Sequence, residues 1–300
     1  MNFSIVIPAK DEEQGLSQLL PELRELYPVA EIIVVNDGSS DGTARVCRDH
    51  GVKVVSHPYS KGNGASIKTG ARVATGDYLV FMDGDGQHNP NDIARLLAKV
   101  EEGYDMVVGA RSGFSSQASV ARWSANTIYN KFASWMVNRK IPDLTSGFRC
   151  VNRKKFLGFI YLLPNGFSYP TTSTMAFFRA GYSVGFVPID VAKRIGKSHI
   201  NMLRDGVRFL LIIFKVGTLY SPLKVYFPVA MITASLGLLN YILQITTHGW
   251  QFTNMSAMLM LAGTIMFLIG LLSEQLTNLQ FKDTSNDGED EGRRPPLSER

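Results

Sequence analysis

Short apolar runs recur through residues 1–200, separated by stretches that mix apolar and polar positions. Uninterrupted runs of this kind are typical of strands buried on both faces, as in a parallel sheet. The strands predicted in this way cover 3–7, 31–35, 52–55, 77–82 and 105–109. Apolar residues at helical spacing lie between them, for example over 13–26 and 61–74, so the pattern predicts an α/β fold with a doubly wound, mostly parallel sheet.

The pattern changes after Arg111. It predicts helices over 119–137 and 171–180, a polar turn over 143–149 and a short strand over 184–187. This second part of the domain therefore departs from the simple alternation of strands and helices.

Residues 207–276 are strongly apolar. Segment 202–219 carries arginine and lysine among leucine, isoleucine and phenylalanine, which is typical of an amphipathic helix at a membrane interface. Segment 225–245 has no formally charged residue, and as a helix of about 31 Å it matches the core of a bilayer. Segment 255–275 is also long enough to span. The alternative is a hairpin buried within a soluble protein.

Basic residues flank these spans unevenly. The loop 246–254 has no lysine or arginine, whereas Lys215 and Lys224 precede the first span and Lys282 follows the second. The positive-inside rule therefore predicts a multi-pass protein of the cell (inner) membrane, with the large domain and both termini in the cytoplasm. The predicted parts are a domain over 1–200, an interfacial helix over 201–220, a transmembrane hairpin over 221–277 and a disordered tail over 278–300.

The charge balance narrows the class of partner. The 300 residues carry a formal net charge of +5, and the end of the chain is acidic, so the remainder is basic. A basic domain with an apolar end favours anionic lipid surfaces or phosphate-bearing substrates. We expect no nucleic-acid partner, because no basic run is interleaved with aromatic residues. Cys47 and Cys150 stand alone, without the spacing of a metal site.

The most informative stretch follows the predicted strand 77–82. Asp83 and Asp85 stand two residues apart, followed by Gln87, and glycines between them allow a tight turn. Ligands of parallel sheets bind beyond the carboxyl ends of the strands, and oxygen ligands suit Mg²⁺ or Mn²⁺ carrying a diphosphate. The alternative is an Asp-Gly turn that only closes a hairpin.

Other polar residues fall at the ends of neighbouring predicted strands. Asp37 follows the second strand, where a carboxylate accepts hydrogen bonds from a nucleobase or ribose; alternatively it caps a helix. Pro8, Ala9 and Glu12 end the first strand at the same edge. Lys61 opens a glycine-rich loop at a helix N-terminus, which by itself is a weak sign of phosphate binding.

Basic residues form the last candidate group. They are Arg111, Arg122, Arg149, Arg194 and Lys197. Taken singly, each is typical of a solvated surface charge. The last two precede the predicted interfacial helix, where cations also hold lipid phosphates.

Six motifs in order carry a resemblance to a known family. They are PAKDEE from residue 8, NDGSSDGT from 36, KGNGA from 61, DGDGQH from 83, TSGFR from 145 and RIGKS from 194. Together they resemble the family 2 glycosyltransferases of GT-A fold, and more narrowly the dolichyl- or polyprenyl-phosphate mannosyl- and glucosyltransferases. The resemblance covers residues 1 to about 200, and paired C-terminal spans also occur in that group.

The resemblance implies roles for these residues. The nucleotide-binding residues would be Pro8, Ala9, Glu12, Asp37, Lys61 and Asp83, the last near the ribose or sugar. Asp85 and Gln87 would bind Mg²⁺ or Mn²⁺. The acceptor phosphate would contact Arg111, Arg122, Asn126, Arg194 and Lys197, and the catalytic residues would be Asp85, Arg111 and Arg122. The chain departs from many relatives at 169–174, which lacks an acid.

The implied activity is metal-dependent, inverting transfer of one hexose, mannose or glucose, from a nucleotide diphosphate sugar of the GDP-mannose or UDP-glucose type. The acceptor would be a polyprenyl phosphate, dolichyl or undecaprenyl, at the cytoplasmic membrane face. Two alternatives remain: transfer to a hydroxyl of a glycolipid, which would need a base, and a non-catalytic nucleotide-binding membrane scaffold. The sequence leaves the oligomeric state open, with a homo-oligomer as one possibility.

Overall fold

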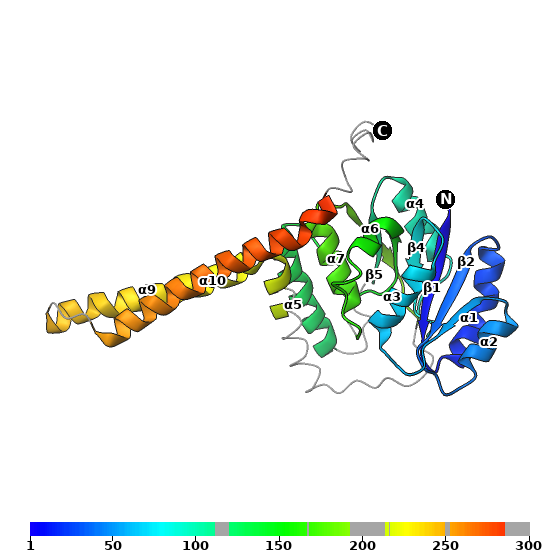
Figure 1. Cartoon of the computed structure of the whole chain (residues 1–300), viewed down its shortest axis with the longest axis horizontal. Helices are drawn as coiled ribbons and strands as arrows, with labels where there is room; N and C mark the ends of the chain where they lie inside the picture. Colours follow the sequence, from blue (N-terminus) through cyan, green and yellow to red (C-terminus); the bar gives the residue numbers. More distant parts are fainter. Residues whose placement is uncertain (112–119, 167, 193–213, 216, 250–252, 286–300) are drawn as a thin grey trace. The chain divides into compact units, whose positions relative to one another are not determined.

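The computed structural model describes residues 1–111, 120–166, 168–192, 214–215, 217–249 and 253–285 (Figure 1). The chain divides into two compact units, with the division at Met202 and Leu203. The first unit contains all the strands that the structure describes, and the second contains two long helices.

One seven-stranded sheet organises the first unit, in the order β3-β2-β1-β4-β6-β5-β7. The strands are β1 (Phe3–Ala9), β2 (Glu31–Asn36), β3 (Lys53–Ser56), β4 (Tyr78–Phe81), β5 (Met106–Arg111), β6 (Arg149–Asn152) and β7 (Val184–Ile189). All run in one direction except β6, which lies antiparallel between β4 and β5. The prediction of a doubly wound, mostly parallel sheet is confirmed, whereas β6, which begins at the last residue of the predicted turn 143–149, was not predicted.

Helices cover both faces of this sheet, because β1 and its neighbours carry apolar side chains on each face. Ile5 and Ile7 belong to a buried cluster that includes apolar residues of α1 (Glu13–Leu26), α2 (Thr43–Asp49) and α4 (Asp92–Glu101). The other face meets α3 (Asn63–Val73), α6 (Arg153–Gly158) and α7 (Tyr169–Arg179). There the rings of Phe81 and Phe156 lie 4.9 Å apart. Helix α5 (Val120–Val137) packs against α7.

The strand directions determine where the loops meet. The carboxyl ends of β1, β2, β4 and β5 lie at one edge of the sheet, and the antiparallel β6 begins at that same edge. We call it the carboxyl edge. The loops that carry the predicted site residues therefore converge there, as expected for ligand sites in open α/β sheets.

The second unit is a hairpin of α9 (Pro222–His248) and α10 (Asn254–Ser285). Glycines let the two helices approach closely: a Cβ at Gly263 would lie 2.9 Å from the carbonyl oxygen of Ala230, and one at Gly237 would lie 3.0 Å from the Leu259 Cβ. Close approach through small residues is typical of helix pairs in membranes. Residues toward the start of α9 thus face the later part of α10, so the pair is antiparallel.

Both helices are long and apolar enough to cross a membrane, and among the described residues no other helix is. Their large apolar side chains are mostly exposed, which is unlike the core of a soluble protein. They contain the predicted spans 225–245 and 255–275. Helix α10 continues through Ser285, so the helical part ends later than the predicted boundary at 277. Of the predicted interfacial helix 201–220, the structure describes only 214–215 and 217–220, which are helical.

Candidate active site

The acidic loop, residues 83–87, follows β4 at the carboxyl edge. The amide N–H of Gln87 donates to Oδ1 of Asp85 at 3.2 Å, which closes a turn around Gly86 with its positive φ of 71°. The side-chain Nε2 of Gln87 donates to the carbonyl oxygen of Ala192 at 3.3 Å. Because the amide nitrogen is used in this way, the oxygen Oε1 of Gln87 is left as an acceptor. Asp85 itself is 7% exposed.

These donors fit a divalent cation of the Mg²⁺ or Mn²⁺ type. Such ions prefer oxygen ligands and are commonly held by one or two carboxylates together with substrate phosphates. Asp85 and the Oε1 of Gln87 would hold the ion, with Asp83 two residues earlier. In the described part of the chain, no group of three or more His, Cys, Asp or Glu residues is placed to enclose a metal. Asp85 and Gln87 together suit an ion that is shared with a phosphate ligand.

Helix α1 supports the acidic loop by direct backbone contact. A Cβ placed on Gly15 would lie 2.2 Å from the carbonyl oxygen of Gly84. We expect Gly15→Ala to displace the loop, weakening Mn²⁺-dependent nucleotide binding by about tenfold and costing about 1–3 kcal/mol of stability. Titration calorimetry with nucleotide and Mn²⁺ measures the first effect. Gly166→Ala is the control, since a Cβ there has no neighbour within 4 Å. If both variants bound the nucleotide with equal affinity, the conclusion that α1 supports the acidic loop would be refuted.

His88 joins the acidic loop to the turn before β6. Its ring stacks on Phe148 with centroids 5.0 Å apart and an interplanar angle of 18°. Burial lowers the pKa of His88 to about 4, although the charge of Asp85 opposes the shift. The ring is therefore neutral near pH 7, and its Nδ1 has no hydrogen-bond partner among the described residues.

Asp37 lies at the carboxyl edge beside β1, as its amide N–H donates to the carbonyl oxygen of Ala9 at 2.8 Å. Its carboxylate accepts four hydrogen bonds, from His57 Nδ1 at 2.7 Å and from Ser60 Oγ, Lys61 N and Gly62 N at 2.8 Å each. Burial alone would raise the pKa of Asp37, but these donors, His57 first, lower it. A carboxylate offers about four acceptor positions. A nucleobase that bonds to Asp37 would therefore replace one donor, most simply the exposed Ser60.

The loops after β1 and β2 are bound to each other by side chains of the two motifs. The amide N–H of Glu12 donates to Thr43 Oγ1 at 3.0 Å, and that of Asp11 donates to Ser39 Oγ at 3.0 Å. Pro8 and Ala9 end β1 beside β2, so all three predicted residues, Pro8, Ala9 and Glu12, lie at the carboxyl edge with Asp37. Much of the NDGSSDGT motif thus holds these loops in place.

The glycine-rich loop 61–65 has a structural role that the sequence did not reveal. The N–H groups of Gly64 and Ala65 donate to the carbonyl oxygens of Gly166 and Asn165 at 3.1 and 2.9 Å. A Cβ at Gly64 would lie 2.0 Å from the carbonyl oxygen of Pro164. The start of α3 is therefore occupied by the chain's own carbonyls. The exposed ammonium of Lys61 lies 5.7 Å from the ring centroid of Tyr59.

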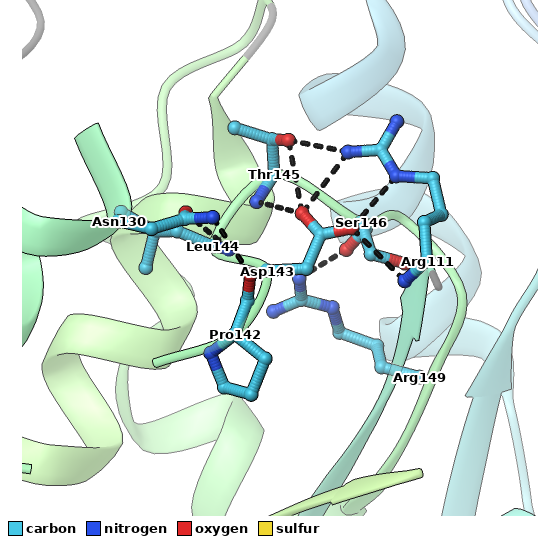
Figure 2. A network of polar contacts seen from close by, with 8 residues as sticks. All are labelled: Arg111, Asn130, Pro142, Asp143, Leu144, Thr145, Ser146 and Arg149. Carbon is cyan, nitrogen blue, oxygen red and sulfur yellow. Dashed lines mark hydrogen bonds and ion pairs between the residues drawn. The ribbon is translucent and has the colours of Figure 1, made fainter. Parts of the chain in front are cut away.

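Arg111 ends β5 and is held in a fork by a buried carboxylate (Figure 2). Its Nε donates to Asp143 Oδ2 at 2.7 Å, and its Nη2 donates to Asp143 Oδ1 at 3.0 Å and to Thr145 Oγ1 at 2.6 Å. Burial would lower the pKa of Arg111, but the hydrogen bonds and charge of Asp143 raise it. Burial would raise the pKa of Asp143, and Arg111 outweighs that effect and lowers it. Both groups are therefore charged at neutral pH.

Arg149 begins β6 and is fully buried, so its interpretation as a solvated surface charge is wrong. Its Nη1 donates to the carbonyl oxygen of Pro170 and to Ser173 Oγ at 2.8 Å, and to Thr174 Oγ1 at 3.0 Å. Its Nη2 donates to the carbonyl oxygen of Ser146. Burial lowers the pKa of Arg149 to about 10. The guanidinium therefore ties the turn before β6 to the start of α7.

The other predicted acceptor-phosphate residues are described only in part. Arg122 and Asn126 lie four residues apart on the backbone of α5, and the Arg122 side chain is outside the described part. Arg194 and Lys197 also lie outside the described residues. The structure thus brings Asp83, Asp85, Gln87, Asp37 and Arg111 to one edge.

Comparison with known proteins finds two family matches along the chain. Residues 4–158 match the family described as "Glycosyl transferase family 2", and residues 221–279 match the "GtrB C-terminal hairpin". The chain is similar to the glycosyltransferase AglJ of Haloferax volcanii, with 26% identity over 92% of this chain and 93% of the relative. It is also similar to an undecaprenyl-phosphate mannosyltransferase of Micrococcus luteus, with 26% identity over 69% and 95%.

Several other curated relatives are matched over about half of their length. Among solved structures, the chain resembles glucosyl-3-phosphoglycerate synthase of Mycobacterium tuberculosis in complex with Mn²⁺, UDP and glucosyl-3-phosphoglycerate. The TM-score is 0.55 at 22% identity, over 71% of this chain and 79% of that one, which supports the fold. The family match covers more than half of the chain, and the chain belongs to glycosyl transferase family 2.

Proposed function

We propose that the protein transfers a single hexose, mannose or glucose, from a nucleotide diphosphate sugar to a polyprenyl phosphate. The observation that carries the proposal is the carboxyl edge, where the acidic loop and the preoriented guanidinium of Arg111 occur together. The same chain carries a hairpin with the length and apolarity of a membrane anchor. A phosphate-bearing lipid and a soluble sugar donor are the two substrates that such a combination suits.

The relatives support the acceptor. One of them is named an undecaprenyl-phosphate mannosyltransferase, and another a polyprenol monophosphomannose synthase. The hairpin over 221–279 also matches a hairpin family of its own, so the similarity is not confined to the nucleotide domain.

The chemistry needs charge compensation more than it needs a base. A divalent ion held by Asp85 and Gln87 would offset negative charge on the leaving diphosphate. The acceptor phosphate is already anionic near neutral pH, since a phosphate monoester has a second pKa of about 6. Arg111 would orient that phosphate, together with Arg122, Asn126, Arg194 and Lys197. Direct attack on the anomeric carbon inverts it, so an α-linked donor yields a β-linked lipid sugar.

The membrane placement follows from the distribution of basic residues. Lys215 and Lys224 precede the first span and Lys282 follows the second, whereas the connecting loop has no lysine. We infer a multi-pass protein of the inner membrane with the catalytic domain and both termini in the cytoplasm. There a soluble nucleotide sugar and the phosphate of a lipid reach the same face.

A transfer assay tests the proposal. Membranes containing the full chain are incubated with radiolabelled GDP-mannose or UDP-glucose, Mn²⁺ and polyprenyl phosphate, and the lipid fraction is counted. We expect one donor to label the lipid, with a β-linkage by NMR, and no labelling of unphosphorylated polyprenol. Labelling of a glycolipid hydroxyl instead, or nucleotide binding without transfer from any donor, would overturn the proposal in favour of a hydroxyl transferase or a scaffold.

A further inference from the structure

The guanidinium of Arg111 is fixed on one side and open on the other. Its Nε and Nη2 are engaged by Asp143 and Thr145, and no described residue accepts a hydrogen bond from its Nη1. The side chain is 25% exposed, whereas that of Asp143 is 7% exposed. The carboxylate therefore holds the buried edge of the fork, and the outer corner is left to donate to an anion.

Asp143 is itself held in place by its neighbours. The amide N–H and hydroxyl of Thr145 donate to Asp143 Oδ1 at 3.0 and 3.1 Å. Asn130 of α5 grips the backbone on both sides: its Nδ2 donates to the carbonyl oxygen of Pro142 at 2.7 Å, and its Oδ1 accepts from the N–H of Leu144 at 3.0 Å (Figure 2). The carboxylate thus has little freedom to follow a displaced arginine.

The same face of α5 makes a second attachment one turn later. Ser134 Oγ accepts from the N–H of Ile141 at 2.9 Å and donates to the carbonyl oxygen of Asn130 at 2.6 Å. Positions four apart on a helix lie one above the other. Asn126, Asn130 and Ser134 therefore follow one another along α5, each one turn after the last. The turn that orients Arg111 is therefore anchored to α5, the helix that also carries Arg122 and Asn126.

We propose that Asp143 and Asn130 are positioning residues for the acceptor phosphate, which hold Arg111 of β5 against α5, the helix that carries Arg122 and Asn126. The assignment rests on the proposed function, because it takes the anion to be the phosphate of the lipid acceptor. Neither residue touches the substrate; each acts through Arg111 and the turn at 142–145. Asp143 fixes the orientation of the Arg111 guanidinium, and the outer corner of that guanidinium remains available to the phosphate.

Asp105 offers a matched control at the opposite end of β5. It pairs with Lys155 at 2.8 Å, and the two side chains are 19% and 14% exposed, so this is also a partly buried ion pair. It also accepts from the N–H and hydroxyl of Ser183 at 2.8 and 2.9 Å. Asp105→Asn should therefore disturb stability as Asp143→Asn does, but away from the carboxyl edge.

The test compares Asp143→Asn, Asn130→Ala and Asp105→Asn in the full chain. An amide at 143 sets an N–H against the guanidinium, so Arg111 loses its fork. We expect the KM for polyprenyl phosphate to rise about tenfold in the first two variants, with the donor KM within about twofold of wild type. Asp105→Asn should leave both KM values unchanged. In a chain that already carries Arg111→Gln, Asp143→Asn should not raise the KM for polyprenyl phosphate further, because Asp143 acts through the Arg111 side chain.

Two results would overturn the inference. One is an equal KM for the lipid in Asp143→Asn and Asp105→Asn; the other is tighter lipid binding in Asp143→Asn than in the wild type. Binding of polyprenyl phosphate to the detergent-solubilised chain, measured by thermophoresis, separates this inference from the proposed function. Weakened binding in Asp143→Asn and Asn130→Ala, with no transfer by wild type, would support the positioning role while refuting the transferase reaction. Unchanged binding beside active wild-type transfer would refute the positioning role alone.

Discussion

Replacing Asp85 with alanine is expected to abolish transfer, lowering kcat/KM by about 1,000-fold or more. The acidic loop offers few oxygen donors, and Asp85 is its buried carboxylate, closed into a turn by the N–H of Gln87. Without it, the charge on the leaving diphosphate is uncompensated, and Gln87 loses the turn that orients its side chain. Mn²⁺-dependent nucleotide binding, measured by calorimetry, should disappear together with activity.

Asp92→Ala is the matched control for this variant. Asp92 begins α4 just beyond the acidic loop and pairs with Arg95 at 2.6 Å, and in the described part of the chain no hydrogen bond joins it to the 83–87 turn. Its loss should leave nucleotide binding within about twofold of wild type. Activity of the wild-type protein in excess EDTA, or intact Mn²⁺-dependent binding in Asp85→Ala, would contradict the metal assignment.

Replacing Arg149 with alanine is expected to destabilise the catalytic domain by about 3–5 kcal/mol. The guanidinium fills a fully buried position and donates to oxygen atoms of the turn before β6 and of α7. Its removal leaves a cavity and strips the Ser146 and Pro170 carbonyls of a donor. For a domain of this size the midpoint of thermal unfolding should fall by roughly 10 °C.

Arg153→Ala provides the comparison, because Arg153 starts α6 a few residues later and makes one long bond, from Nε to the Ala71 carbonyl oxygen at 3.4 Å. We expect its midpoint to shift by a few degrees at most. If both alanine variants unfolded at the same temperature, Arg149 would not be the tie between β6 and α7. Differential scanning fluorimetry of the solubilised protein measures both.

The sequence predicted those parts of the fold that depend on uninterrupted runs of apolar residues. Apolar runs fix β1, β2 and β4, and the polar residues after them necessarily reach the carboxyl edge once these strands pair in parallel. That is why Ala9, Asp37 and Asp85 lie at one edge as expected. The two long apolar segments are equally local signals, and they coincide with α9 and α10.

What the sequence concealed depends on contacts between distant residues. Strand β6 begins with an arginine and ends with an asparagine, so it lacks the continuous apolar run that marks β4, and its direction is set by pairing with β4 and β5. In the sequence, Arg149 cannot be told from a surface charge. Its partners in α7 are a backbone carbonyl group and hydroxyl groups, and such groups do not mark a buried arginine in a sequence. From the sequence, the carboxylate of Asp37 is expected to be available to a ligand. In the structure, donors of the loop 57–62, which follows β3, already form hydrogen bonds to it.

The antiparallel β6 has a consequence for how such an enzyme diversifies. Because β6 separates β4 from β5, the acidic loop and Arg111 belong to strands that share no hydrogen bonds. On the proposed assignment, substitutions and insertions between β5 and β6 remodel lipid recognition while the ladder of β1, β2 and β4 stays intact. Donor and acceptor preferences can then evolve at separate rates, and new lipid specificities can arise without rebuilding the nucleotide half.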